Sequence, residues 1–106
     1  MDLDDTIVQQ VWEMGRVSLD RDRADWREDE CGAWMHRDQY NHGNSEFGWH
    51  IKNINAGGDN SLENLRPFHI ENEYNLVAHE PRCRITADRI DIPPTAAVGK
   101  PRNKST

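Results

Sequence analysis

The chain has 106 residues, a formal net charge of −6, an apolar fraction of 35% and a mean hydropathy of −0.98. This length predicts a single domain with a small core, in which the four tryptophans carry much of the buried area because aromatic side chains bury the most surface. No segment has the length and apolar character of a membrane helix or signal peptide, so we expect a soluble, cytoplasmic protein with no membrane partner.

Charge is distributed unevenly along the chain. Residues 1–30 contain ten acidic and four basic side chains. Residues 31–79 contain six acidic and three basic side chains, and residues 80–106 contain three acidic and six basic ones. Proteins that bind nucleic acid gain much of their affinity by neutralising phosphates. The acidic character of the first 79 residues therefore predicts that direct DNA binding is weak or absent.

A short helix is expected near the N-terminus. Thr6 and Gln9 match a capping box with Thr6 as the N-cap. Apolar residues follow at helical spacing, and Gly15 is suited to end the helix. This pattern predicts a short amphipathic packing helix.

A segment dense in charges of alternating sign follows, over residues 18–30. Such alternation is typical of a solvated surface, and Trp26 is the one large apolar anchor in the segment. The aspartates lack the glycine and the closing glutamate of an EF-hand loop, so a calcium site is not expected. We predict instead an acidic face that contacts a partner, formed by Asp20, Asp22, Asp25, Glu28, Asp29 and Glu30.

Residues 31–51 are expected to form a β-hairpin. Residues 33–36 would be its first strand, and residues 47–51 would be its return strand. Turn-forming residues lie between them at 41–44. Tyr40 and Trp49 are predicted to pack this hairpin onto the core.

The two cysteines, Cys31 and Cys83, lie far apart and in no CxxC pair, so a zinc knuckle is unsupported. Free buried thiols are typical of an intracellular chain. A Cys31–Cys83 disulfide is the alternative, and the sequence leaves both states open.

The second half begins with a glycine loop, because Gly57 and Gly58 permit positive φ. Residues 65–68 suit an edge strand, since Pro67 cannot donate a ladder hydrogen bond. A helix with one apolar face is predicted over residues 69–79, because its apolar residues fall at positions i, i+4, i+7 and i+8. A half-exposed strand over 82–92 and a flexible basic tail over 93–106 complete the prediction. The apolar residues that define the helix are Ile70, Tyr74, Val77 and Ala78.

This order of strand, glycine loop, Asn-Leu strand and helix resembles the ββα core of HNH endonucleases. The resemblance is carried mainly by residues 48–75, GWHIKNINAGGDNSLENLRPFHIENEYN, and extends to VWEMGR at 11–16, WREDECGAW at 26–34 and NSEFGW at 44–49. It covers roughly residues 8–88. It implies an α+β fold in which the ββα core follows an N-terminal helix and hairpin and precedes a C-terminal strand and tail. Residues 1–92 would then be one HNH-like domain, with residues 93–106 as its tail.

The catalytic positions depart from that family. There, an Asp-His pair supplies a metal ligand and the general base, and an asparagine on the helix completes the metal site. Lys52, Asn53 and Glu73 stand at these positions, and Asn64 alone is unchanged. A lysine ammonium repels a divalent cation and accepts no hydrogen bond, and an amide cannot act as a base near neutral pH. The resemblance therefore implies a degenerate site without catalytic residues, bound metal or cofactor.

A compensating contact is predicted at the degenerate site, where Lys52 would pair with Glu73 across the former metal position. The family resemblance and the acidity together favour a non-catalytic binding protein encoded by a phage or mobile element. It would occupy a protein partner such as a defence or nuclease complex of the host cell, including as an anti-CRISPR inhibitor. Two alternatives are an active metal-dependent endonuclease that uses His50, His69 or Glu73, and a structural protein without a nucleic-acid link.

Overall fold

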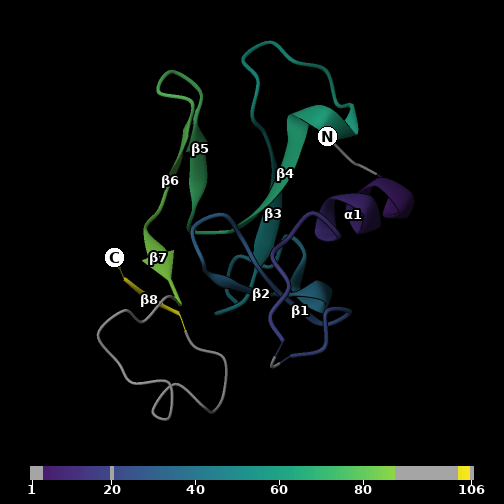
Figure 1. Ribbon diagram of the computed structural model, residues 1–106, viewed down its shortest axis with the longest axis vertical. Coiled ribbons are helices and arrows are strands. Elements are labelled where there is room, and N and C mark those ends of the chain that lie inside the picture. Colours follow the sequence, from purple (N-terminus) through teal and green to yellow (C-terminus); the bar gives the residue numbers. More distant parts are fainter. Residues whose placement is uncertain (1–3, 20, 88–102, 106) are drawn as a thin grey trace.

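The computed structural model describes residues 4–19, 21–87 and 103–105. Within these ranges the protein is α+β, as predicted, with one α-helix and short strands that pair antiparallel, two at a time (Figure 1). No helix in this part of the chain combines the length and the apolar character needed to cross a lipid bilayer.

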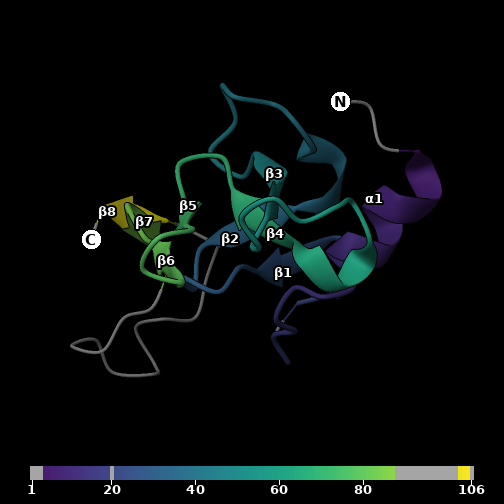
Figure 2. The same ribbon diagram turned by 90° about the horizontal axis from the view of Figure 1, so that it is seen from above.

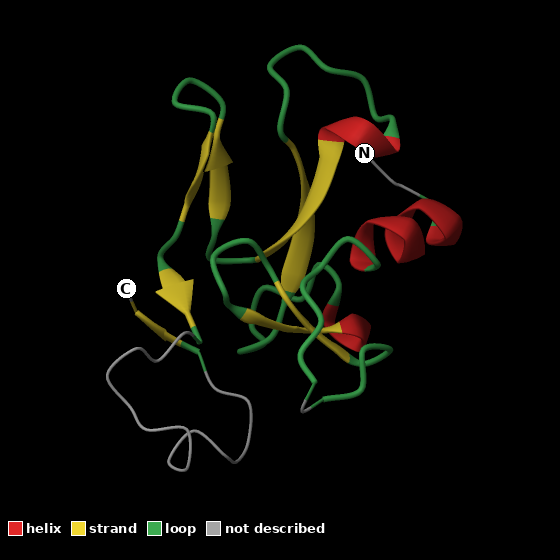
Figure 3. Ribbon diagram, in the orientation of Figure 1, coloured by secondary structure: helices red, strands yellow, loops and turns green. Residues whose placement is uncertain are grey.

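The strands form four separate pairs, β1–β2, β3–β4, β5–β6 and β7–β8. Figures 1 and 2 show α1 on one side of the β3–β4 pair and the β5–β8 strands on the other. Much of the remaining chain is loop or turn (Figure 3). In chain order the elements are α1 (Asp5–Trp12), β1 (Trp26–Glu28), β2 (Trp34–His36), η1 (Arg37–Gln39), β3 (Trp49–Asn53), η2 (Leu62–Asn64), β4 (Leu65–His69), β5 (Glu73–Asn75), β6 (Glu80–Arg82), β7 (Ile85–Thr86) and β8 (Lys104–Ser105).

The N-terminal helix is present, but its cap differs from the prediction. Asp4 is the N-cap, and its carboxylate accepts a hydrogen bond of 2.9 Å from the backbone N–H of Ile7. Thr6 lies inside the first turn instead. At the other end, the Arg27 guanidinium donates to the carbonyls of Glu13 and Gly15, at 3.0 and 3.1 Å. A cation is favourable at this end of a helix because the last carbonyls carry partial negative charge.

The predicted hairpin over residues 31–51 is wrong, because β2 pairs with β1 and not with β3. The cause is the tight turn between β1 and β2. Gly32 has φ of +82°, and the Asp29 carboxylate accepts hydrogen bonds from the backbone N–H groups of Cys31 and Ala33, both at 2.9 Å. This local turn lets β2 fold back onto β1 before the chain reaches β3.

The predicted helix over residues 69–79 is also wrong. His69 ends β4, and β5 and β6 form a hairpin through the tip at residues 76–79. The Asn75 side chain accepts from the N–H groups of Val77 and Ala78, both at 3.0 Å, and His79 adopts φ of +55°. These are turn features, because asparagine side chains mimic a backbone turn. Val77, predicted to face the core, is 92% exposed. The helix of a ββα core is therefore not found here.

Part of the predicted flexible tail is docked onto the body. β8 pairs with β7, and the Asn103 amide bonds to both the N–H and the C=O of Trp34, at 2.7 and 3.0 Å. The prediction of a flexible tail is therefore wrong for residues 103–105, while residues 93–102 lie outside the described chain. The predicted strand over 82–92 is found only in part, as the end of β6 and as β7, and residues 88–92 lie outside the described chain as well.

The apolar core lies between α1, β2 and the β3–β4 pair. Val8, Trp12, Met35 and Trp49 form its central cluster, with the rings of Trp12 and Trp49 centred 5.1 Å apart. Tyr40 packs on Trp49 at 4.8 Å, as predicted. Only two of the four tryptophans are fully buried. Trp26 and Trp34 are half-buried, and Trp26 makes edge contacts with Trp34, His36 and Phe47.

The approach to β3 depends on Gly48. A Cβ added there would lie 2.0 Å from the backbone oxygen of His42, whereas one added at Gly43 in the same loop meets nothing within 4 Å. We predict that Gly48→Ala lowers the free energy of unfolding by about 1–3 kcal/mol or more, because the backbone must shift to relieve the overlap. Urea denaturation measures this, with Gly43→Ala as the matched control; equal effects of the two changes would contradict the prediction.

Candidate functional site

The glycine loop between β3 and β4 is braced by Asn53. Its Nδ2 donates to the carbonyls of Gly58 and Asp59, at 3.1 and 2.9 Å, and its Oδ1 accepts from the backbone N–H of Asn55 at 2.8 Å. Both amide hydrogens and the amide oxygen are thus engaged within the loop. Asn53, which the HNH resemblance would place at the position of a general base, therefore serves as a structural clamp of this loop.

Asn64 completes the clamp from the opposite side of the loop. Its Nδ2 donates to the backbone and side-chain oxygens of Asp59, at 3.1 and 3.0 Å, and its Oδ1 accepts from the side chain of Asn55. Its backbone oxygen also accepts from the N–H of Ile54 at 2.8 Å. The hydroxyl and backbone N–H of Ser61 lower the pKa of the Asp59 carboxyl, which Asn64 also contacts. Asn64 therefore bridges the loop through both its side chain and its backbone.

Lys52 and Glu73 lie at ion-pair distance, as predicted, with 4.0 Å between Nζ and Oε1. Their side chains are 36% and 58% exposed, so water screens the attraction. An exposed pair of this kind contributes about 0–1 kcal/mol. The pair connects β3 to β5, not to the predicted helix, so it is a weak link between two strands.

The two histidines considered as atypical metal ligands are held by the backbone. His69 is buried; its Nε2–H donates to the Glu46 carbonyl at 2.6 Å, and its Nδ1 accepts from the N–H of Glu71 at 3.0 Å. The Nε2–H of His50 donates to the Asn72 carbonyl at 2.9 Å. Burial lowers the pKa of His50, an effect opposed by that hydrogen bond and reinforced by Lys52. Both ring nitrogens of His69 are therefore occupied.

No cluster of three or more His, Cys, Asp or Glu side chains that could hold a metal ion is found among the described residues. His50, His69 and Glu73 thus do not converge on a common ligand position.

A buried polar network is centred on Asp29, a residue predicted to lie on the surface. Asp29 is 1% exposed, so the prediction that it belongs to an acidic face is wrong. Its Oδ1 accepts from the N–H groups of Cys31 and Ala33, and its Oδ2 accepts from the N–H of His69 and the Nδ2 of Asn72, all at 2.9 Å. Four donors to one carboxylate offset the cost of removing it from water.

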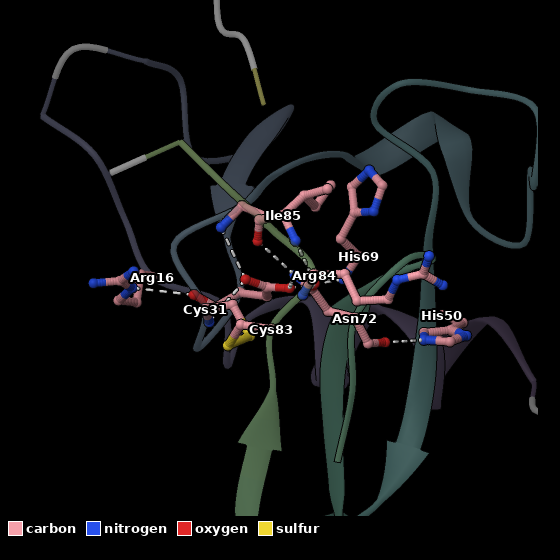
Figure 4. Close-up of a disulfide and its surroundings, with 10 residues drawn as sticks. Arg16, Cys31, His50, His69, Asn72, Cys83, Arg84 and Ile85 are labelled. Atoms are coloured by element: carbon pink, nitrogen blue, oxygen red, sulfur yellow. Dashed lines mark hydrogen bonds between the residues drawn. A yellow bond between two sulfur atoms is a disulfide. The ribbon is translucent and has the colours of Figure 1, made fainter. Parts of the chain in front are cut away.

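Asn72 extends this network toward the C-terminal strands (Figure 4). Besides its bond to Asp29, its Nδ2 donates to the Ile85 carbonyl at 3.1 Å, and its Oδ1 accepts from the N–H groups of Arg84 and Ile85 at 2.8 and 3.0 Å. Asn72 is fully buried. The Asp29–Asn72 pair therefore joins the β1–β2 turn, the end of β4 and the start of β7.

A disulfide lies beside this pair and joins Cys31 to Cys83 (Figure 4). The free-thiol state favoured from the sequence is thus replaced by the bonded alternative. The bond closes a loop of 52 residues, for which the chain-entropy model gives about 4 kcal/mol of stabilisation. Such bonds are typical of oxidising compartments and rare in the cytosol.

The remaining residues of the predicted acidic face have different surroundings. Asp22, Asp25 and Glu30 are exposed, Glu28 is half-buried, and Asp20 lies outside the described residues. Glu30 lies 3.9 Å from Arg66, which partly neutralises it. Among the described residues of the predicted set, two exposed carboxylates show no ion pair with a basic side chain. These are Asp22 and Asp25.

The loop that carries these two aspartates is fixed against α1. The Trp12 indole N–H donates to the Arg23 carbonyl at 3.2 Å, and Arg27 bonds both to that carbonyl and to the carbonyl of Glu13. Burial lowers the pKa of Arg27, an effect that Glu13 opposes. From here on, acidic face denotes a set that differs from the predicted one and consists of exposed carboxylates on this loop, on α1 and at the two caps of α1: Asp22, Asp25, Asp5, Asp4 and Glu13.

Comparison of the chain with protein-family models, with curated proteins and with solved structures finds no match. The HNH resemblance therefore depends on the quoted residues alone. The Asp29–Asn72 pair was missed because its role depends on distant contacts. One local signal was available, since an aspartate shortly before a glycine is typical of a side-chain-capped turn.

The Asp29 network generates a stability prediction. Asp29→Ala should lower the free energy of unfolding by at least about 3 kcal/mol, because it leaves buried N–H groups without acceptors. Urea denaturation measures the effect. Asp25→Ala makes the same chemical change at an exposed position. Asp25 directly precedes β1, the strand that Asp29 directly follows, and its replacement should lower the free energy of unfolding by less than about 0.5 kcal/mol. Comparable losses in both variants would show that the carboxylate of Asp29 is not a structural centre.

Proposed function

We propose that this protein acts by binding a protein partner through its acidic face and does not cleave phosphodiester bonds. The observation that carries the proposal is the Asn53 clamp. A general base must take a proton from water near neutral pH, whereas an amide cannot, and both N–H donors and the oxygen of the Asn53 amide bond to the glycine loop.

The contacts of the neighbouring positions support the same conclusion. Lys52 offers an ammonium 4.0 Å from Glu73, at the position where the family's metal ligand would stand. A cation there opposes binding of a second, divalent cation by direct repulsion. Each of the three positions that differ from the HNH pattern is thus suited to a structural contact and not to hydrolysis.

The chemistry of the partner follows from charge. An acidic surface attracts a basic one over roughly a Debye length, and basic grooves are the surfaces with which proteins hold nucleic acids. The acidic face would therefore compete with nucleic acid for such a groove. A nucleic-acid-guided defence complex in the cytoplasm of a host cell is the partner class we propose, with the present protein as its phage-encoded or mobile-element-encoded inhibitor.

Absence of cleavage is the first prediction. Incubation with supercoiled plasmid and Mg²⁺, Mn²⁺, Ni²⁺ or Zn²⁺ should leave the plasmid intact, because position 53 holds an amide and the described residues contain no cluster of three or more His, Cys, Asp or Glu side chains for a metal ion. Gel electrophoresis of the plasmid measures nicking. Metal-dependent nicking that is lost in His50→Ala or Glu73→Ala would instead support the endonuclease alternative.

Charge reversal tests the binding surface. In a mobility-shift assay with purified RNA-guided CRISPR effector complexes and labelled target duplexes, the protein should reduce DNA binding. Asp22→Lys with Asp25→Lys should weaken this inhibition by about tenfold or more, since two favourable contacts become repulsive. The matched control, Glu63→Lys with Glu80→Lys, changes the net charge equally at exposed sites outside the acidic face. Equal loss in both variants would remove the acidic face from the proposal.

A further inference from the structure

The C-terminal strands are attached to the body without an apolar core of their own. Every side chain of residues 73–87 is exposed or half-buried, whereas each buried apolar residue of the described chain lies between residues 8 and 68. The body and the C-terminal strands are therefore stabilised by different forces. Burial of apolar surface supports the body. Polar contacts, one covalent bond and an aromatic contact between buried Phe68 and half-buried Tyr74, with ring centroids 6.3 Å apart, hold the strands against it.

The polar contacts gather around the disulfide. Asn72 receives the N–H groups of Arg84 and Ile85, which directly follow Cys83 in the chain. Two residues after Ile85, the N–H of Ala87 donates to the carbonyl of Gly32, the residue next to Cys31, at 2.8 Å. Each such bond has a small net value, because water satisfies the same groups when the contact opens. The disulfide keeps the donors and acceptors of these hydrogen bonds close together, and so at high effective concentration.

The two cysteine residues differ in exposure. Cys31 is 8% exposed in the turn between β1 and β2, whereas Cys83 is exposed between β6 and β7. An incoming thiolate can therefore reach the Cys83 sulfur from solvent, and the buried Cys31 sulfur becomes the leaving group.

We propose that the Cys31–Cys83 bond is a redox-controlled latch, which a cellular dithiol reductant opens to release residues 73–87 and 103–105 from an otherwise folded body. One thiolate of the reductant attacks Cys83 Sγ to form a mixed disulfide, and Cys31 departs as a thiolate that takes up a proton. The second thiol of the reductant then displaces Cys83 as a thiol. Two electrons pass to the protein, and the reductant leaves as a disulfide.

Opening the latch uncovers a strand edge. The Asn103 amide bonds both backbone groups of Trp34, so it covers the Trp34 end of the outer edge of β2, and Ala87 bonds the carbonyl of Gly32 in the preceding turn. The His36 N–H at the other end of β2 donates to the Phe47 carbonyl and is not affected by the latch. An uncovered edge offers unpaired N–H and C=O groups to an extended peptide. The latch does not depend on the binding function proposed above, because it concerns only the attachment of the strands.

Amide hydrogen exchange by NMR tests the latch on the full chain, oxidised or reduced with a phosphine. We expect the amides of Trp34, Arg84, Ile85 and Ala87 to exchange on the order of tenfold faster or more after reduction. The amide of Ile54, bonded to Asn64 between β3 and β4, should keep its protection. Unchanged exchange at the first four amides would overturn the proposal, and so would loss of protection at Ile54, which would mean that the body unfolds as well.

A double variant provides the matched control. Cys31→Ser with Cys83→Ser cannot form the bond, so without reductant it should show the exchange pattern of the reduced native chain and should not respond to the phosphine. Protection at Arg84 and Ile85 equal to that of the oxidised chain would show that the Asn72 contacts suffice without the bond, and would overturn the latch.

Discussion

The structure depends on one buried carboxylate. Asp29 accepts four hydrogen bonds from three separate segments, namely the turn that follows it, the end of β4 and the side chain of Asn72. A buried negative charge is tolerated only where donors replace the lost hydration. The donors at Asp29 are backbone and amide N–H groups, whose positions are fixed by the fold. The charge therefore selects the arrangement in which all three segments meet.

A buried polar network of this kind suits a small chain with few apolar residues. A domain of this size buries limited apolar surface, so further stabilisation must come from polar networks or covalent bonds. The tryptophan-centred cluster supports α1 and the central strand pair, while the Asp29–Asn72 pair and the disulfide attach the rest. The division has a consequence for response to conditions. Reductant acts on the attachment of the C-terminal strands, whereas urea and temperature act on both parts.

The sequence was informative where local chemistry decides the structure. The α+β class, the N-terminal helix, the edge strand around Pro67 and the packing of Tyr40 on Trp49 could all be predicted, because each depends on nearby residues or on burial of a large ring. The helix over 69–79 failed because periodicity was outweighed by the Asn75 turn and by the capture of Asn72. The surface assignment of Asp29 failed because its partners lie up to 43 residues away. A pattern of alternating charge carries no record of such distant donors.

Asn53, at the position that the HNH resemblance assigns to a general base, links the proposed loss of catalysis to an observed structural role. Catalysis and stability place opposite demands on the residue at position 53, because a base must keep its acceptor available while a loop brace must engage it. An amide satisfies the second demand with two donors and one acceptor, as Asn53 does. Histidine in its neutral form has one donor and one acceptor, so it could not make all three contacts. The glycine loop is thus held by a residue that hydrolysis could not use. These opposite requirements at position 53, and not an absent metal, are the physical reason to propose that this protein binds its target without cutting.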